Sequence, residues 1–171
     1  MMRPWRTLTL FGALLCSSAT LAANEIDTFV VQTFASQTAQ ANVLWLTPAI
    51  KSAAQAETGI APAGARLRYW RAGARTAWVL DRIGKEEPIT FGVVVENNAI
   101  VAMRVITYRE SRGHEIRSPR WLAQFAGARS GDRGLDRRVD NITGATLSVR
   151  ASVAVARLAL FYHQQALADA R

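Results

Sequence analysis

The stretch Ile89–Tyr108, ITFGVVVENNAIVAMRVITY, decides the fold of this 171-residue chain. Two runs rich in valine and isoleucine, Ile89–Glu96 and Ile100–Tyr108, flank the pair Asn97-Asn98. β-Branched residues favour strands, and asparagine tolerates the positive φ angles of a tight two-residue turn. The stretch therefore predicts an antiparallel β-hairpin in the central sheet of the domain.

Further strands and helices are expected on either side of this hairpin. Residues 66–71 and 76–82 have the composition of strands and are joined around Gly73. Helices flanking such an antiparallel sheet make an α+β fold in one small domain. One of these helices has threonine as its cap, proline in its first turn and a glycine at its end, which is typical of helix boundaries. The expected helices are residues 24–37, the segment from Thr47-Pro48 to Gly59, and residues 119–125.

A long C-terminal helix is expected after a charged loop at residues 126–139. Residues 147–168 are rich in apolar side chains and contain neither glycine nor proline. Polar residues recur at every seventh position and form one stripe, while apolar residues cover the other faces. This pattern is typical of a largely buried helix. The stripe consists of Arg150, Arg157, Gln164 and Arg171.

The seven residues Asp140–Thr146, DNITGAT, lie directly before this helix. Either Thr143 or the Gly144-Ala145 turn is expected to open the helix, which places Thr146 in the first turn. A phosphate ester at that position would meet free backbone N–H groups and the positive end of the helix dipole. The alternative is an ordinary capped helix start, with Thr143 as the cap and Gly144 in the turn.

The N-terminus has the pattern of a secretory signal peptide. Met1–Arg6 is short and basic, Thr7–Thr20 is apolar and small, and Ala22 ends a small-residue cleavage site. The apolar run is shorter than the ~20 residues that a membrane helix needs, so an uncleaved anchor is the less favoured alternative. Removal of residues 1–22 also removes Cys16, the only cysteine, which excludes disulfides and cysteine–metal chemistry. We expect a periplasmic protein.

The positive charge of the chain limits its partners. The formal net charge is +8 at pH 7, and removal of the signal peptide takes two arginines and no acid, which leaves +6. The scatter of the basic residues and the export signal argue against nucleic acid. Anionic cofactors, the acidic faces of redox proteins or peripheral contact with a membrane surface fit this charge. The two histidines, His114 and His163, lie far apart in the sequence, so no metal site is expected.

The DNITGAT motif and the hairpin region together resemble one family. The motif resembles the flavinylation site of the FMN-binding domain family, which includes subunits of sodium-pumping NADH:quinone reductase and Rnf-type complexes. In that family the last threonine carries FMN through a phosphoester bond, and here that residue is Thr146. Residues 89–127 resemble the body of such a domain, and residues 83–88 resemble its glycine–lysine entry to the sheet. His114 departs from the pattern, since the family often has a small residue there. The matching positions in the body are Tyr108, Arg109, Glu110, Ser111, Gly113, Glu115, Ile116, Trp121, Gln124 and Phe125.

The resemblance implies covalent FMN, transferred from FAD by a periplasmic Mg²⁺-dependent flavin transferase. Arg109 or Arg112 would stabilise an anionic reduced flavin, and Trp121 would supply a stacking face for the ring. The alternative is that both arginines are solvated and that Trp121 and Phe125 are core residues. With Thr146 as the attachment residue, the expected cofactor-binding residues are Asp140, Thr143, Gly144, Ala145, Ser148, Glu110, Ser111, Arg112, Gly113, Glu115 and Trp121.

Two classes of function are consistent with these features. The favoured one is an exported electron-transfer flavoprotein that exchanges electrons with a membrane or periplasmic redox protein. The alternative is a non-redox exported α+β domain that binds a protein partner or an anionic ligand. The sequence has no GxGxxG fingerprint, which argues against direct nicotinamide use and favours a carrier over a stand-alone oxidoreductase. The expected organisation is a signal peptide at 1–22, an N-terminal helical segment at 23–64 and an FMN-binding domain at 65–168.

Overall fold

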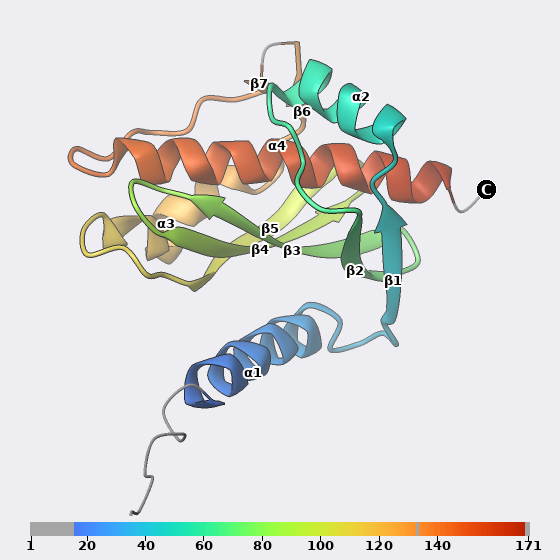
Figure 1. The fold of residues 1–171 in the computed structure, drawn as a ribbon, viewed down its shortest axis with the longest axis horizontal. Coiled ribbons are helices and arrows are strands. Elements are labelled where there is room, and N and C mark those ends of the chain that lie inside the picture. The colour runs from blue at the N-terminus through green and yellow to red at the C-terminus, as the bar shows by residue number, and fades with distance from the viewer. Residues whose placement is uncertain (1–15, 133, 170–171) are drawn as a thin grey trace, which may run out of the picture.

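A computed structural model describes residues 16–132 and 134–169 of the chain (Figure 1). The strands of its main sheet are β1 (Gln40–Trp45), β2 (Arg66–Ala72), β3 (Arg75–Ile83), β4 (Pro88–Glu96) and β5 (Ala99–Thr107). They lie in that order and each pairs antiparallel with its neighbour. The α-helices are α1 (Cys16–Thr33), α2 (Pro48–Thr58), α3 (Pro119–Leu122) and α4 (Thr146–Ala168), and the 3-10 turns are η1 (His114–Arg117) and η2 (Ala123–Phe125). The predicted α+β fold, a single small domain with an antiparallel sheet flanked by helices, is confirmed.

The hairpin predicted around Asn97-Asn98 connects β4 to β5. Asn97 and Asn98 have φ angles of 51° and 59°, and Glu96 lies opposite Ala99 across the turn. Residues 89–95 of β4 are all buried, because both faces of this strand are covered. This burial explains why the strand is a continuous apolar run rather than an alternation of apolar and polar residues.

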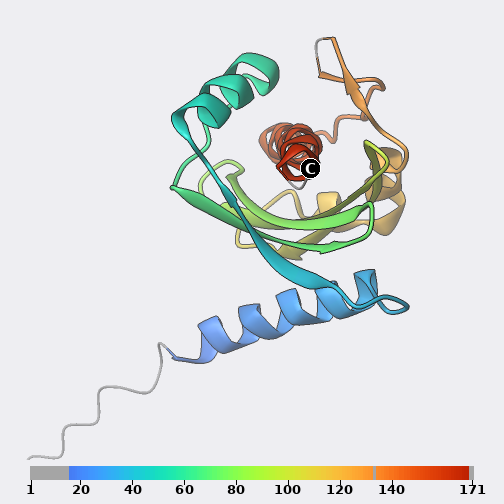
Figure 2. The same ribbon diagram turned by 90° about the vertical axis from the view of Figure 1, so that its right-hand side faces the viewer.

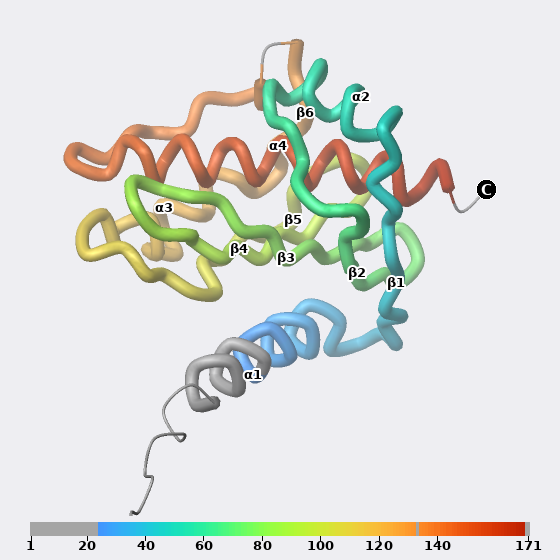
Figure 3. The backbone as a smooth tube through the Cα atoms, in the orientation of Figure 1, coloured from blue at the N-terminus to red at the C-terminus, as the bar shows by residue number. Residues whose placement is uncertain are grey.

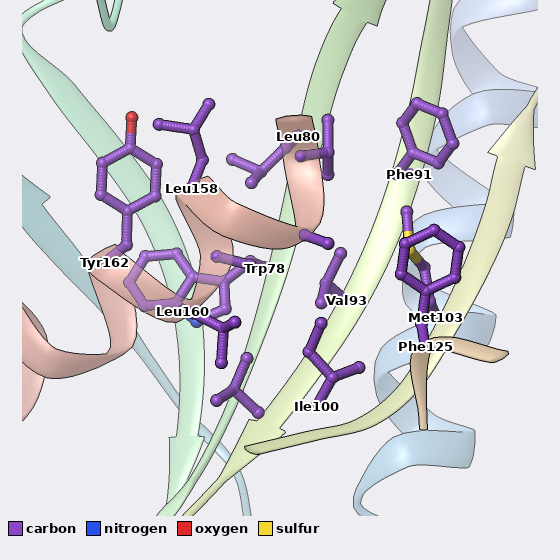
Figure 4. Packing of buried hydrophobic residues seen from close by; sticks show 14 of the residues in the cluster. Trp78, Leu80, Phe91, Val93, Ile100, Met103, Phe125, Leu158, Leu160 and Tyr162 are labelled. Carbon is purple, nitrogen blue, oxygen red and sulfur yellow. The ribbon is translucent and has the colours of Figure 1, made fainter. Parts of the chain in front are cut away.

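Helix α4 occupies the concave side of the sheet, where Figure 2 shows it end-on. Leu158, Leu160 and Tyr162 of α4 belong to the same hydrophobic core as Trp78 of β3 (Figure 4), and the ring centroids of Trp78 and Tyr162 lie 5.6 Å apart. Trp78 is completely buried. Full burial of one such large apolar side chain contributes about 1.5–3 kcal/mol, so this helix–sheet contact stabilises the fold.

The sequence predicted both the burial and the polar stripe of α4. The helix begins at Thr146, directly after the Gly144-Ala145 turn and one residue before the apolar run that starts at Leu147. Arg150 and Gln164 are exposed, and Arg157 reaches α2 by donating a hydrogen bond to the backbone oxygen of Glu57 at 2.9 Å. Arg171, the last member of the predicted stripe, lies outside the described residues. The stripe therefore marks the side of α4 that faces away from the sheet.

Helix α1 covers the opposite face of the sheet (Figures 2 and 3). Phe29 and Phe34 are buried there against Ala77 of β3 and Val94 of β4. Gly92 of β4 makes this contact possible, because a Cβ atom at that position would lie 2.7 Å from the Phe29 ring. A glycine inside a strand therefore marks the close approach of another element.

The helix predicted at residues 24–37 corresponds to the later part of α1, which ends at Thr33. The predicted signal peptide, residues 1–22, lies mainly outside the described residues and stays a prediction. Across residues 16–132 and 134–169, no helix is long and apolar enough to cross a membrane.

Helix α2 has both of the boundaries predicted from its sequence. The Thr47 hydroxyl accepts a hydrogen bond from the backbone N–H of Ile50 at 3.2 Å, and Pro48 lies in the first turn. Gly59 ends the helix with a φ of 71° and donates its N–H to the Gln55 oxygen. Such a cap contributes about 1 kcal/mol, and the left-handed glycine satisfies a carbonyl that the helix end leaves unpaired.

Three local predictions need correction. Residues 40–45 form an edge strand within segment 23–64, which was expected to be helical, because pairing with β2 decides their conformation and Leu44 reaches the core. The helix expected at 119–125 is one turn of α3 followed by the tighter η2 turn, a common form of helix ending. The loop expected at 126–139 contains a small hairpin of β6 (Ser130–Gly131) and β7 (Gly134–Leu135).

Candidate functional site

A cleft of about 560 Å³ opens where three segments of the chain meet. The segments are the turn between β3 and β4, the loop after β5 and the start of α4, which lie at the same end of the molecule in Figure 1. The volume is within the range of small-molecule binding sites. The cleft is lined by Lys85, Glu86, Glu110, Ser111, Arg112, Gly144, Ala145, Thr146, Leu147 and Ser148.

Helix α4 begins in this cleft without a side-chain cap. Ala145 occupies the N-cap position, and no side chain among the described residues caps the N–H groups that every helix start leaves unpaired. Gly144 has a φ of 84°, and the N–H of Ala145 donates to the Ile142 oxygen at 2.9 Å. The Gly144-Ala145 turn therefore opens the helix, and the alternative in which Thr143 caps it is wrong. An uncapped helix start is suited to binding an anionic group.

Thr146 is the first residue of α4 and lies half-buried in the wall of the cleft. Its placement in the first turn of the helix is confirmed. The Thr146 Oγ1 atom accepts a hydrogen bond from the Asn141 side-chain amide at 3.2 Å. A hydroxyl group has one proton and two lone pairs, so this bond orients the oxygen and leaves its proton available for transfer.

The Glu110 carboxylate fixes the turn between β3 and β4. Its Oε1 atom accepts hydrogen bonds from three consecutive backbone N–H groups, those of Lys85 (2.5 Å), Glu86 (2.8 Å) and Glu87 (3.1 Å). Partial burial acts to raise the pKa of Glu110, but the three N–H donors outweigh it and lower the pKa below its ordinary value. The carboxylate therefore stays ionised and holds one wall of the cleft in place.

Two glycines allow the walls of the cleft to approach each other. A Cβ atom on Gly84 would lie 2.8 Å from Glu110 Oε1 and 3.3 Å from the Ser148 hydroxyl. Gly113 has a φ of 83°, and a Cβ atom there would lie 3.0 Å from the Ala145 Cβ. The loop after β5, which contains Gly113, is thus packed directly against the DNITGAT segment.

The two arginines considered for flavin contact have different surroundings. Arg112 lines the cleft, and its backbone oxygen accepts a hydrogen bond from the Tyr108 hydroxyl. Arg109 instead donates to the Pro88 backbone oxygen at 2.9 Å and to the Thr90 hydroxyl at 3.2 Å. Arg109 therefore holds the start of β4 through these hydrogen bonds. Of the two arginines, only Arg112 lines the cleft and can act on a ligand there.

Trp121 lies in the hydrophobic core and does not line the cleft. Its side chain is 8% exposed and meets the Phe125 ring edge-on at 5.5 Å, which agrees with the alternative that these two residues are core. Trp121 and Asp140 line a separate hollow of about 300 Å³. Thr143 and Glu115 are exposed and lie outside the cleft.

Sequence reasoning missed three residues that line the cleft: Lys85, Glu86 and Leu147. Lys85 and Glu86 could have been found from the sequence, because residues 83–88 resemble the glycine–lysine entry to the sheet in the FMN-binding domain family. Leu147 is 45% exposed, which is unusual for a leucine at the start of a largely buried helix. Among the described residues, no group of three His, Cys, Asp or Glu side chains is arranged to hold a metal ion.

Comparison with known proteins agrees with this geometry. Residues 84–160 match the model of the FMN-binding domain family. A comparison with curated proteins found no match. The matched range contains the β4–β5 hairpin, the DNITGAT segment and every residue that lines the cleft. Residues 84–160 of this chain are therefore an FMN-binding domain, which supports a flavin-binding protein with FMN as its cofactor.

Proposed function

We propose that this protein carries FMN covalently through a phosphoester bond to Thr146 and acts as an exported electron carrier. The observation that supports the proposal best is the position of the Thr146 hydroxyl at the uncapped start of α4, in the wall of the cleft. The Thr146 hydroxyl, which would accept the flavin phosphate, therefore lies beside unpaired backbone N–H groups and in a cleft of small-molecule size.

The residues of the cleft fit a flavin phosphate. A phosphate on Thr146 would meet the first-turn N–H groups of α4 and the positive end of the helix dipole. The Arg112 side chain adds positive charge to the same cleft, where Lys85 pairs with Glu86 at 2.9 Å. The exposed Leu147 side chain offers an apolar surface beside the attachment point. FMN in this site would supply one- and two-electron redox chemistry.

In the proposed attachment, a phosphoester bond to Thr146 replaces the phosphoanhydride bond that joins the FMN phosphate to AMP in FAD. Thr146 Oγ1 forms the new bond to phosphorus, the bond between the two phosphate groups of FAD breaks, and AMP leaves. The hydroxyl proton passes to a base of a Mg²⁺-dependent flavin transferase. Asn141 supports this step, because it donates to Oγ1 and leaves the proton on the other side free for removal.

Export and the choice of partners complete the proposal. The signal-peptide pattern of residues 1–22 would place the protein in the periplasm, where a covalent tether prevents loss of the cofactor. Its electron partners would be membrane or periplasmic redox proteins. The net positive charge of the chain fits an acidic partner surface or peripheral contact with a membrane.

The substitution Thr146→Val tests the attachment residue. Valine has nearly the shape of threonine and removes only the nucleophilic hydroxyl, so the variant should fold and carry no covalent flavin. Thr38→Val is the matched control, because Thr38 is exposed and lies outside both the motif and the cleft. Each protein is incubated with FAD, Mg²⁺ and a flavin transferase, and its intact mass is measured. A flavin adduct on Thr146→Val would refute the assignment.

A further inference from the structure

We propose that Trp121 and Gln124 are positioning residues for covalent flavin attachment. They hold the backbone of Asp140, the first residue of the DNITGAT motif, so that its carboxylate is presented to the flavin transferase. This inference rests on the proposed function and concerns how the transferase recognises the chain, rather than which residue accepts the flavin.

Both backbone polar groups of Asp140 are used in this contact. The Trp121 indole N–H donates to the Asp140 oxygen at 2.9 Å, and the Asp140 N–H donates to the Gln124 Oε1 atom at 3.0 Å. We call this pair of hydrogen bonds the Asp140 clamp. The backbone of a residue held at both its N–H and its C=O cannot rotate without breaking at least one bond, so the clamp fixes the direction of the Asp140 Cα–Cβ bond.

The clamp is anchored in the core of the domain. Trp121 is 8% exposed, and the Phe125 ring that it contacts is completely buried. The Asp140 side, in contrast, belongs to an irregular segment between β7 and α4. A rigid support for a loop residue is the arrangement expected where a partner must find that residue in one position.

The Asp140 carboxylate is available to a partner. Asp140 is exposed, and within the described part of the chain its carboxylate takes part in no hydrogen bond or ion pair. It lies at the hollow of about 300 Å³ that Ser118, Arg120, Trp121 and Gln124 also line. This hollow shares no residue with the flavin cleft that contains Thr146. The transferase would therefore recognise Asp140 at the hollow and transfer the flavin to Thr146 at the cleft, so the two ends of the motif act at different places.

The test compares rates of flavin attachment at increasing concentrations of the chain, with transferase, FAD and Mg²⁺ held fixed. Trp121→Phe keeps an aromatic ring and removes the N–H donor, and Gln124→Met keeps the length of the side chain and removes the acceptor. Loss of one such hydrogen bond should raise the KM for the acceptor chain by roughly three- to ten-fold. The kcat at saturation should stay close to that of the unchanged chain. Circular dichroism melts establish that each variant is folded.

The same substitutions in an Asp140→Ala background separate positioning from packing. If the clamp acts through the Asp140 carboxylate, Trp121→Phe should not raise KM further once that carboxylate is gone. An equal rise in both backgrounds would overturn the inference, as would an unchanged KM for both single variants. A chain without any substitution that acquires no flavin would overturn the proposed function and this inference together, whereas normal attachment with unaffected clamp variants would overturn this inference alone.

Discussion

The buried side chain of His163 should make the stability of this protein sensitive to mild acid. His163 lies on α4 and is completely buried, with Nδ1 2.8 Å from the Thr76 hydroxyl. The same hydroxyl oxygen accepts the Trp78 indole N–H at 2.8 Å. The Nε2 atom of His163 has no hydrogen-bond partner within the described residues. Burial, reinforced by the positive charge of Arg71, lowers the pKa of His163 to about 4.

The direction of the effect follows from the two protonation states. The pKa of His163 is about 4 in the folded chain, against 6.5 for an ordinary histidine. Between these two values the unfolded chain binds more protons than the folded chain, so the free energy of unfolding falls as the pH falls. At 1.36 kcal/mol per pKa unit, the complete loss is about 3 kcal/mol, of which about 2 kcal/mol appears between pH 7 and pH 5.

Urea unfolding at pH 7 and at pH 5 measures this loss directly. The unchanged chain should lose about 2 kcal/mol between the two pH values. His163→Gln should lose much less, whatever its absolute stability, because glutamine does not titrate. His114→Gln is the matched control and should behave like the unchanged chain, since His114 is exposed. Equal pH dependence in His163→Gln and the unchanged chain would refute the reasoning.

Three further substitutions test the cleft and the residues around it. Arg112→Gln should lower the flavin potential by tens of millivolts, because the positive charge near the cleft favours an anionic reduced ring. Arg109→Gln should leave the potential unchanged and instead lower the free energy of unfolding by about 1 kcal/mol, because the hydrogen bonds of Arg109 are lost. Potentiometric titration and urea unfolding of both variants measure the two effects. A changed potential in Arg109→Gln together with an unchanged potential in Arg112→Gln would contradict this prediction. Gly113→Ala should destabilise the fold by roughly 1–2 kcal/mol, given a φ of 83° and the close Ala145 contact, and should slow flavin attachment. Attachment at the normal rate in a destabilised Gly113→Ala chain would show that the contact with Ala145 does not shape the acceptor segment.

The sequence was most informative where local chemistry decides the structure. Asn97-Asn98 specified a hairpin because few residues tolerate two consecutive positive φ angles. Thr47-Pro48 and Gly59 specified the ends of α2 for similarly local reasons. The DNITGAT segment was recognised from seven consecutive residues, and the last of them lies in the first turn of α4, as expected.

Structural features that depend on contacts between residues far apart in the sequence could not be predicted from local sequence patterns. Strand β1 has no strong strand pattern of its own and owes its conformation to pairing with β2. The bonds from Glu110 to the turn at residues 85–87 join segments more than twenty positions apart. Arg109 and Arg112 lie three residues apart and were equally good candidates for the cofactor, and only the fold directs one into the cleft.

The dimensions of the cleft are set by backbone packing rather than by flexible side chains. Gly84 brings the turn between β3 and β4 to within van der Waals reach of Ser148, and Gly113 brings the loop after β5 against Ala145, so both loops close on the first turn of α4. The remaining support comes from an ionised Glu110 that holds three backbone N–H groups at once. Because α4 is itself fixed in the concave side of the sheet, these contacts extend the rigidity of the core to the acceptor hydroxyl. In the proposed electron carrier, this rigidity would present the cofactor to successive partners in the same orientation.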